Sequence, residues 1–158
     1  MALDTTIERF TTPAFAQRRA RAEEVGRDAI LVLARIGLAV LMFWHVKIAW
    51  DYTGGVGGLV RGFDVMGIPF PELSARFNIA LESIGALALI LGVGVRTIGL
   101  LMAVNMAGAW YYVHTSGLYA MDGNGPELAI AIGLLSLMFV VTGPGRVALD
   151  HVRGSRRS

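Results

Sequence analysis

Four long apolar stretches occupy most of this 158-residue chain and limit what it can fold into. They cover residues 29–50, 77–95, 97–113 and 127–142. Each is close to the ~20 residues that an α-helix needs to cross the hydrocarbon core of a bilayer. Only 16% of the residues are charged, where a soluble domain has about 25%, and the mean hydropathy is +0.58. The sequence therefore predicts an all-α integral membrane protein, a four-helix bundle.

The polar segments at the two ends divide the chain into three regions. Residues 1–28 hold five arginines and five acidic residues, and 17–28 is expected as a short helix on the membrane surface or as a solvated tail. No apolar core of a cleavable signal peptide is evident there, so the first stretch is expected to stay as a span. The transmembrane domain covers 29–146, and a basic tail covers 147–158.

The connections between the apolar stretches differ in length. The longest is 51–76, in which residues 59–66 predict a short amphipathic helix after a glycine-rich turn. The turn at 92–96 is so short that the second and third spans must form an antiparallel hairpin. The third connection contains a strong turn signal at 122–126.

The arginines predict an orientation for the bundle. If the N-terminus is inside, ten arginines lie in cytoplasmic segments and only Arg61 and Arg76 lie in the outer loops. The ten are Arg9, Arg18, Arg19, Arg21, Arg27, Arg96, Arg146, Arg153, Arg156 and Arg157. The positive-inside rule therefore predicts two cytoplasmic termini in a bacterial-type plasma membrane. Because topology explains the net charge of +2, nucleic acid is not an expected partner.

Ionisable side chains near or inside the apolar stretches are the candidates for function, because charge is costly there. At a rise of about 1.5 Å per residue, the topology places five polar residues in the outer half of the membrane. They are His45, Lys47, Glu82, His114 and Glu127. We expect Glu82 to pair with His45 or Lys47. These two lie about 200° apart around their helix, so only one can face Glu82, and Lys47 is the better candidate to extend to the interface.

Each of these residues also has a purely structural interpretation. Glu82 can be an ion-pair partner that sets the register of the helices, and His45 a hydrogen-bonded interior histidine. His114 and Glu127 lie at the outer interface, where solvated polar side chains are common. Arg35, in the inner third of the first span, is expected to reach the interface or to cap another helix. Asn105 is expected to form hydrogen bonds between helices.

The chemistry of some cofactors is not supported by the sequence. There are no cysteines, which excludes disulfides, thiolate metal sites and a dithiol relay, and no metal site is expected. No glycine-rich loop follows a strand, so no dinucleotide site is expected. His45 and His114 lie on different helices at comparable depth, as a bis-histidine haem requires, but two histidines are a weak signal and haem is not expected.

Four groups of short motifs follow one another along residues 29–151. They are Arg35-Ile-Gly-Leu with His45, Glu82-Ser-Ile-Gly85 with Leu91-Gly92 and Arg96, then His114, Gly117 and 123–127, and finally 143–146 with Asp150. In this order and spacing they resemble the DoxX family of small four-helix membrane proteins. The chain departs from the family pattern after the histidine, where Val46 replaces the usual glycine and Lys47 comes earlier than the usual lysine.

The resemblance implies a membrane redox setting. Relatives include the DoxD-type subunit of a thiosulfate:quinone oxidoreductase, and actinobacterial members are associated with oxidative-stress and thiol-redox complexes. The first hypothesis is therefore an oxidoreductase with quinone as acceptor, or the membrane subunit of a redox complex. Glu82 and His45 would be catalytic. The quinone head group would be bound by Trp44, His45, Glu82, His114 and Glu127, with Trp110 beside them.

Two other hypotheses remain open at this point. In one, the chain is a non-catalytic membrane anchor for a soluble redox enzyme, which docks on the N-terminal helix and the basic tail. In the other, it is a small transporter or proton conduit that uses the same polar cluster. Four spans are few for a transporter, so this last function would require a homo-oligomer.

Overall fold

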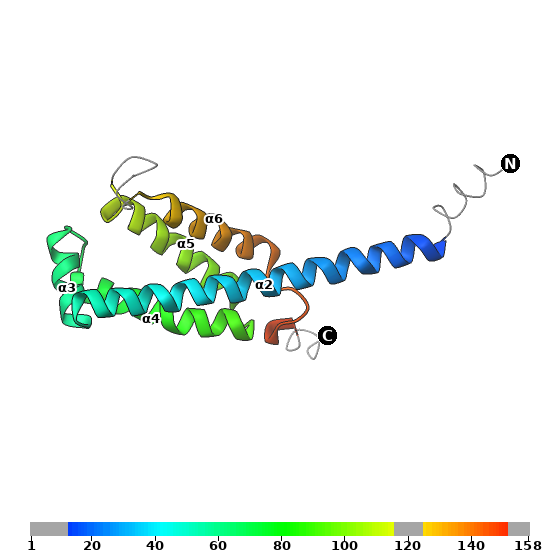
Figure 1. Cartoon of the computed structure of the whole chain (residues 1–158), viewed down its shortest axis with the longest axis horizontal. Helices are drawn as coiled ribbons and strands as arrows, with labels where there is room; N and C mark the ends of the chain where they lie inside the picture. The colour runs from blue at the N-terminus through cyan, green and yellow to red at the C-terminus, as the bar shows by residue number, and fades with distance from the viewer. Residues whose placement is uncertain (1–12, 116–124, 152–158) are drawn as a thin grey trace.

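The computed structural model describes residues 13–115 and 125–151, and every regular element in those ranges is a helix. The helices are α2 (Pro13–Thr53), α3 (Val56–Val65), α4 (Pro71–Leu91), α5 (Val95–Tyr112) and α6 (Glu127–Thr142) (Figure 1). The predicted all-α class is confirmed, and α3 is the helix predicted in the first long connection. Gly117, residues 122–124, Arg9 and the arginines after residue 151 lie outside the described residues.

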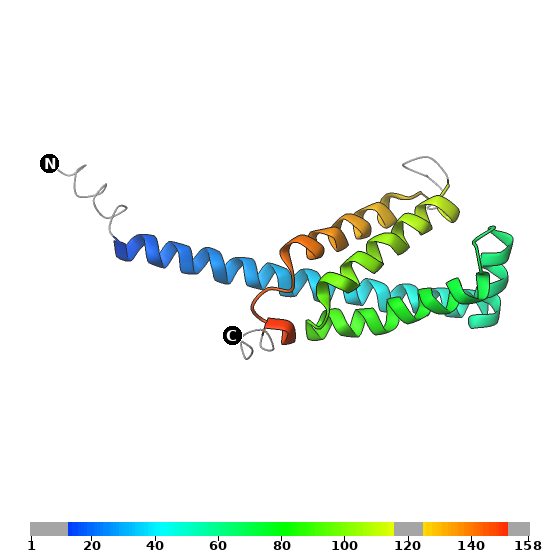
Figure 2. The same cartoon turned by 180° about the vertical axis from the view of Figure 1, so that it is seen from behind.

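The helices pack as two pairs. α2 lies along α4, α5 lies along α6, and contacts between α4 and α5 join the pairs. Figure 2 shows that the pairs are closest near the turn between α4 and α5 and separate toward the end that carries α3. The short 92–94 turn joins α4 and α5 in the antiparallel hairpin that the sequence predicts.

The first helix is longer than the predicted span. α2 runs unbroken for 41 residues, so 17–28 is helical but continues directly into the span. The sequence predicted a separate surface helix or a solvated tail for residues 17–28. The helix continues because strong helix formers fill this segment and no proline follows Pro13 within it. Residues 13–27 are all exposed and project beyond the other helices (Figure 1).

Two helices have the length and apolar character of membrane spans. They are α2 and α4, and α6 is also apolar but shorter, at 16 residues. Only 28% and 33% of the residues in the most apolar windows of α2 and α4 are buried. The core helix of a soluble protein would be mostly buried, whereas this exposed apolar surface is suited to a lipid environment. Exposed apolar side chains include Ile30, Leu33, Ile84, Leu87, Leu134 and Val141.

Small residues allow α5 and α6 to pack closely. A Cβ at Gly99 would lie 2.7 Å from the carbonyl oxygen of Ser136, so only glycine fits at this contact. The buried Ser136 hydroxyl donates to the carbonyl of Ile132 at 2.7 Å, one turn earlier in α6. The core that joins the helices includes Leu38, Met42, Leu89, Met102 and Phe139.

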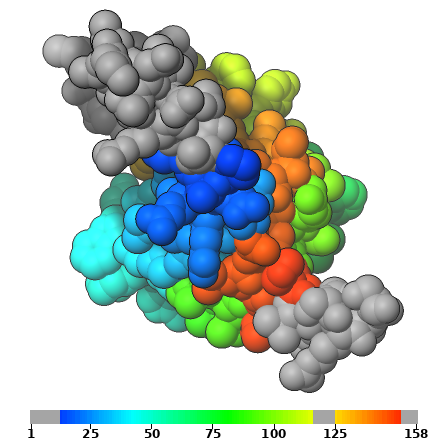
Figure 3. All heavy atoms as spheres, turned by 90° about the vertical axis from the view of Figure 1, so that its right-hand side faces the viewer, coloured from blue at the N-terminus to red at the C-terminus, as the bar shows by residue number. Residues whose placement is uncertain are grey.

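Residues 143–151, here called the C-terminal strap, cross one end of the bundle. Figure 3 shows the orange-red strap beside the blue N-terminal part of α2. Arg35 is only 2% exposed, and its Nη2 donates to the carbonyl oxygen of Val147 at 2.6 Å. The Arg146 backbone N–H donates to Asp28 Oδ1 at 3.1 Å. Arg35 therefore holds the strap, a role that differs from the predicted interface or helix-cap role.

The strap also binds the turn between α4 and α5. The Asp150 N–H donates to the carbonyl of Gly92 at 3.0 Å, and Asp150 Oδ2 accepts from the Val95 N–H at 3.3 Å. Gly92 has a φ of +69°, and a Cβ there would overlap Arg35 Nη1 and Ala148. Glycine is needed for both reasons. The strap thus connects α2 to the α4–α5 hairpin.

Candidate functional site

Glu82 lies in the middle of α4 with a side chain only 1% exposed. Its Oε2 is 2.8 Å from Nδ1 of His45 in α2. Its Oε1 accepts a hydrogen bond from Asn105 Nδ2 in α5 at 3.3 Å. Asn105 Nδ2 also donates to Asn78 Oδ1 at 2.9 Å, one turn before Glu82. These four residues, the Glu82 cluster, connect three helices through polar contacts.

Helical spacing explains why these side chains meet. Asn78 and Glu82 are four residues apart and therefore lie on one face of α4. His45 follows the buried Met42 by three residues, and Asn105 lies between the buried Met102 and Met106. Each polar residue thus belongs to the stripe that its helix turns toward a neighbouring helix. Burial of Glu82 is tolerated because both of its oxygens have a partner.

The structure decides between the two predicted partners of Glu82. His45 faces Glu82, whereas the Lys47 ammonium is paired with Asp51 one turn further along α2. Both members of that second pair are more than 60% exposed. The prediction left the partner of Glu82 open between His45 and Lys47; the partner is His45, and the predicted outward direction of Lys47 is confirmed. The interhelical role predicted for Asn105 is confirmed as well.

His45 connects the buried carboxylate to the outside of the bundle. Its side chain is 55% exposed, in contrast to that of Glu82. Its Nε2 has no hydrogen-bond partner in the described part of the chain. An ionised carboxylate only accepts hydrogen bonds. When Glu82 is ionised, His45 Nδ1 therefore carries a hydrogen and donates a hydrogen bond to Glu82. This arrangement can pass a proton between a buried acid and a molecule at the helix surface.

Two predicted site residues lie at the ends of α5 and α6, outside the hydrogen bonds of the Glu82 cluster. His114 follows α5, and Glu127 begins α6. Each has a buried polar atom, Nδ1 of His114 and Oε2 of Glu127, that has no hydrogen-bond partner among the described residues. Within residues 13–115 and 125–151, no three His, Asp or Glu side chains are arranged to hold a metal ion.

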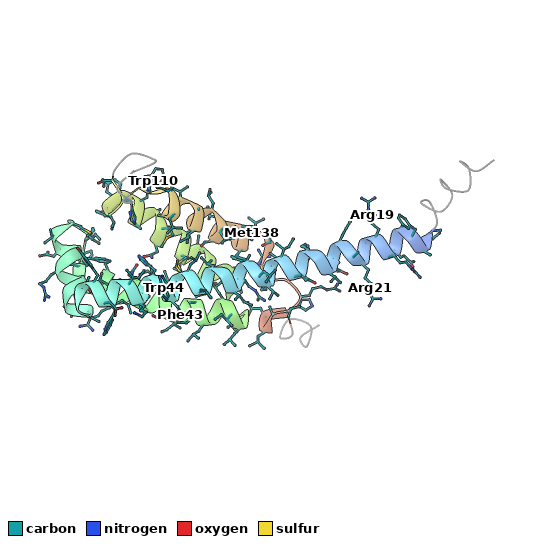
Figure 4. The ribbon with its side chains drawn as sticks, viewed as in Figure 1. Arg19, Arg21, Phe43, Trp44, Trp110 and Met138 are labelled. Atoms are coloured by element: carbon teal, nitrogen blue, oxygen red, sulfur yellow. The ribbon has the colours of Figure 1, made fainter. Side chains whose placement is uncertain are left out.

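The two tryptophans proposed for the head-group pocket lie on outer surfaces. Trp44 is 62% exposed and Trp110 is 52% exposed. Figure 4 shows Trp44 on α2 and Trp110 well away from it, toward the end of α5. The structure therefore does not place the two rings side by side.

Asn78 was not predicted as a site residue. Its sequence signal is its position four residues before Glu82 within an apolar stretch, which places both polar groups on one helix face. Asp28 was also missed, because it lies at the edge of the first stretch and its partner is the Arg146 backbone 118 residues away.

Comparison with known proteins places the Glu82 cluster inside a known family domain. The DoxX family model matches residues 30–115, which contain all four members of the cluster. An uncharacterized protein of Haemophilus influenzae is 39% identical over 133 residues, covering 79% of this chain and 91% of that protein. No solved structure matches the chain significantly.

Proposed function

Because the chain belongs to the DoxX family of membrane proteins, we propose that it is a quinone-linked oxidoreductase or the membrane subunit of a redox complex. The observation that carries this proposal is the hydrogen bond between buried Glu82 and half-exposed His45. Quinone reduction needs a proton source that a membrane-dissolved molecule can reach, and His45 has this position. The exposed apolar surface of α2 and α4 is suited to the apolar tail of a quinone.

The redox step balances with a reduced sulfur compound as donor, the class that the family resemblance implies. Two thiosulfate ions joined through a new S–S bond release two electrons, and a quinone takes up two electrons and two protons to become a quinol. In our proposal a proton moves from His45 Nε2 to a quinone oxygen, while Glu82 stabilises the positive imidazolium beforehand. Water returns the proton to His45, and the same path supplies the second proton.

The proposal includes four spans with both termini in the cytoplasm. The arginine distribution supports this orientation. The C-terminal strap binds α2 near Asp28, which supports termini on the same side. The chain has no native cysteine, so single introduced cysteines test the orientation directly. A membrane-impermeant maleimide should label Asp64→Cys in intact cells, and Arg18→Cys only after permeabilisation; the reverse pattern would contradict the orientation.

The activity is tested with Glu82→Gln, which keeps the side-chain shape but cannot become an anion. Purified protein in nanodiscs is assayed for thiosulfate-dependent reduction of a short-chain quinone. We expect the rate to fall about 100-fold, the lower range for loss of acid–base catalysis. Lys47→Gln is the matched control, because Lys47 lies two residues from His45 but pairs outward with Asp51. A Glu82→Gln variant that folds and keeps the wild-type rate would refute the catalytic role.

A scaffold function is the second candidate, and the exposed extension of α2 favours it. Residues 13–27 project beyond the bundle with charged side chains such as Arg19 and Arg21 directed outward (Figure 4). If the chain organises a soluble redox enzyme, a photo-crosslinker at Arg21 should capture that enzyme in cells, and one at Trp44 should not. Quinone reduction by the purified chain alone would argue against a purely structural function.

A further inference from the structure

A cavity of about 760 Å³ lies at the strap end of the bundle, apart from the Glu82 cluster. Its volume falls within the range of about 300–1,000 Å³ that is common for ligand sites. Three arginines from three different elements line it, namely Arg27 of α2, Arg96 of α5 and Arg146 of the C-terminal strap. Such a convergence of positive charge is suited to an anionic ligand.

The acidic residues that line the cavity already have partners. Glu24 forms an ion pair with Arg146. Asp150 accepts a hydrogen bond from the Val95 N–H at the start of α5. Neither carboxylate is therefore paired with the two remaining arginines.

Arg96 and Arg27 form no ion pair among the described residues. Arg96 donates to two backbone carbonyls in the last turn of α6, which are neutral acceptors. Arg27 has no ion-pair or hydrogen-bond partner in the described part of the chain, although its helix position places it at the cavity. Three arginines and two carboxylates, Glu24 and Asp150, thus line the same space, so the arginines are in excess by one positive charge.

The first turn of α5 adds a favourable dipole. Gly94, Arg96 and Thr97 line the cavity, so the N-terminal end of this 18-residue helix faces it. The first N–H groups of a helix have no acceptor within the helix, and the positive end of the helix dipole attracts anions. The Val95 N–H already donates to Asp150, so only the N–H groups after Val95 are left for a ligand. Phosphate groups are common ligands at such helix ends.

The cavity lies where the polar and apolar parts of α2 meet. On one side is the exposed charged extension, residues 13–27. On the other side, Ile30 and Leu33 are 65% and 69% exposed, and Val147 of the strap is 64% exposed. An apolar surface beside a basic cavity matches a lipid whose tails cover the surface while its head group enters the cavity.

We propose that this cavity binds the phosphate group of an anionic phospholipid from the cytoplasmic leaflet, held by Arg27, Arg96 and the start of α5. The proposal uses the orientation proposed above but does not depend on the redox activity. The positive-inside rule treats all cytoplasmic arginines alike. A binding site instead predicts that loss of Arg27 or Arg96 weakens lipid binding more than loss of another cytoplasmic arginine.

The test is native mass spectrometry of the full chain in detergent, titrated with phosphatidylglycerol or phosphatidylcholine. We expect phosphatidylglycerol to bind at least about tenfold more tightly, and Arg27→Gln to weaken it about tenfold. Because Arg27 has no partner to lose among residues 13–115 and 125–151, this variant should fold. Arg18→Gln is the matched control: it removes the same charge from the same exposed helix but lies outside the cavity.

Three results would overturn the proposal. Equal losses for Arg18→Gln and Arg27→Gln would indicate diffuse surface attraction. Equal binding of the two lipids by the wild-type chain, which needs no variant, would exclude a site for an anionic head group. Displacement of phosphatidylglycerol by an equal concentration of inorganic phosphate would show that the cavity takes free phosphate. Quinone reduction should be unchanged in Arg27→Gln, so failure of one proposal leaves the other measurable.

Discussion

The hydrogen bond between His45 and Glu82 should make a measurable energetic connection between α2 and α4. Interhelical hydrogen bonds in membrane proteins contribute about 0.6 kcal/mol on average and about 1.7 kcal/mol at most. The 2.8 Å contact involves a carboxylate that is 1% exposed, which places it at the strong end of this range. Half of the His45 side chain is exposed, which moderates the effect. We expect a coupling free energy of about 1–1.7 kcal/mol.

A double-mutant cycle with His45→Ala and Glu82→Ala measures this coupling. The free energy of unfolding of the four proteins is determined by titration with sodium dodecyl sulfate in mixed micelles. The matched control is the cycle with Lys47→Ala and Asp51→Ala, a pair on the same helix with both members more than 60% exposed. Exposed pairs of this kind couple by about 0–0.5 kcal/mol.

A His45–Glu82 coupling no larger than that of the control pair would contradict this prediction. Values below about 0.5 kcal/mol are indistinguishable from simple additivity. Such a result would mean that Glu82 finds other partners in the membrane, and the proton path through His45 would lose its structural basis.

Three further predictions concern the hydrogen bonds around the site and the strap. Gly92→Ala should destabilise the fold by about 3 kcal/mol, and the control Gly94→Ala by only about 1 kcal/mol. Both glycines have a positive φ, but only Gly92 lacks space for a Cβ. Equal shifts in the melting temperatures of the two variants would contradict this. Asn105→Ala should cost about 1 kcal/mol and slow quinone reduction about tenfold, because Glu82 Oε1 loses its donor; an unchanged rate would limit Asn105 to packing. Deletion of 143–158 removes the four hydrogen bonds that, among the described residues, tie the strap to α2 and to the α4–α5 hairpin, and should cost about 3–4 kcal/mol in denaturant titrations. A loss below about 1 kcal/mol would show that the strap is dispensable.

Most of the fold followed from local properties of the sequence. Apolar length predicted helices at the right places because a helix in lipid satisfies its own backbone hydrogen bonds. The boundary at residue 28 was less certain, since a polar segment of strong helix formers continues a helix without any apolar signal. The sequence therefore predicted a tail and a separate span, whereas the structure has a single 41-residue helix across both.

The candidate site was predictable only in part. Sequence spacing placed Glu82, His45 and Lys47 at similar depth, because rise per residue depends on the helix alone. The rotation of α2 about its axis, which directs His45 to Glu82 and turns Lys47 away from it, depends on how that helix packs against α4. The packing of α5 against α4 brings Asn105 to Asn78.

The four apolar stretches and their embedded polar residues were determined by the sequence itself, because solvent preference is a property of each residue. Contacts between distant segments were decided only by tertiary structure. Arg35 and Val147 are 112 residues apart, and no local pattern indicates their hydrogen bond. The cavity lined by Arg27, Arg96 and Arg146 likewise exists only because three segments far apart in the chain meet at one end of the bundle.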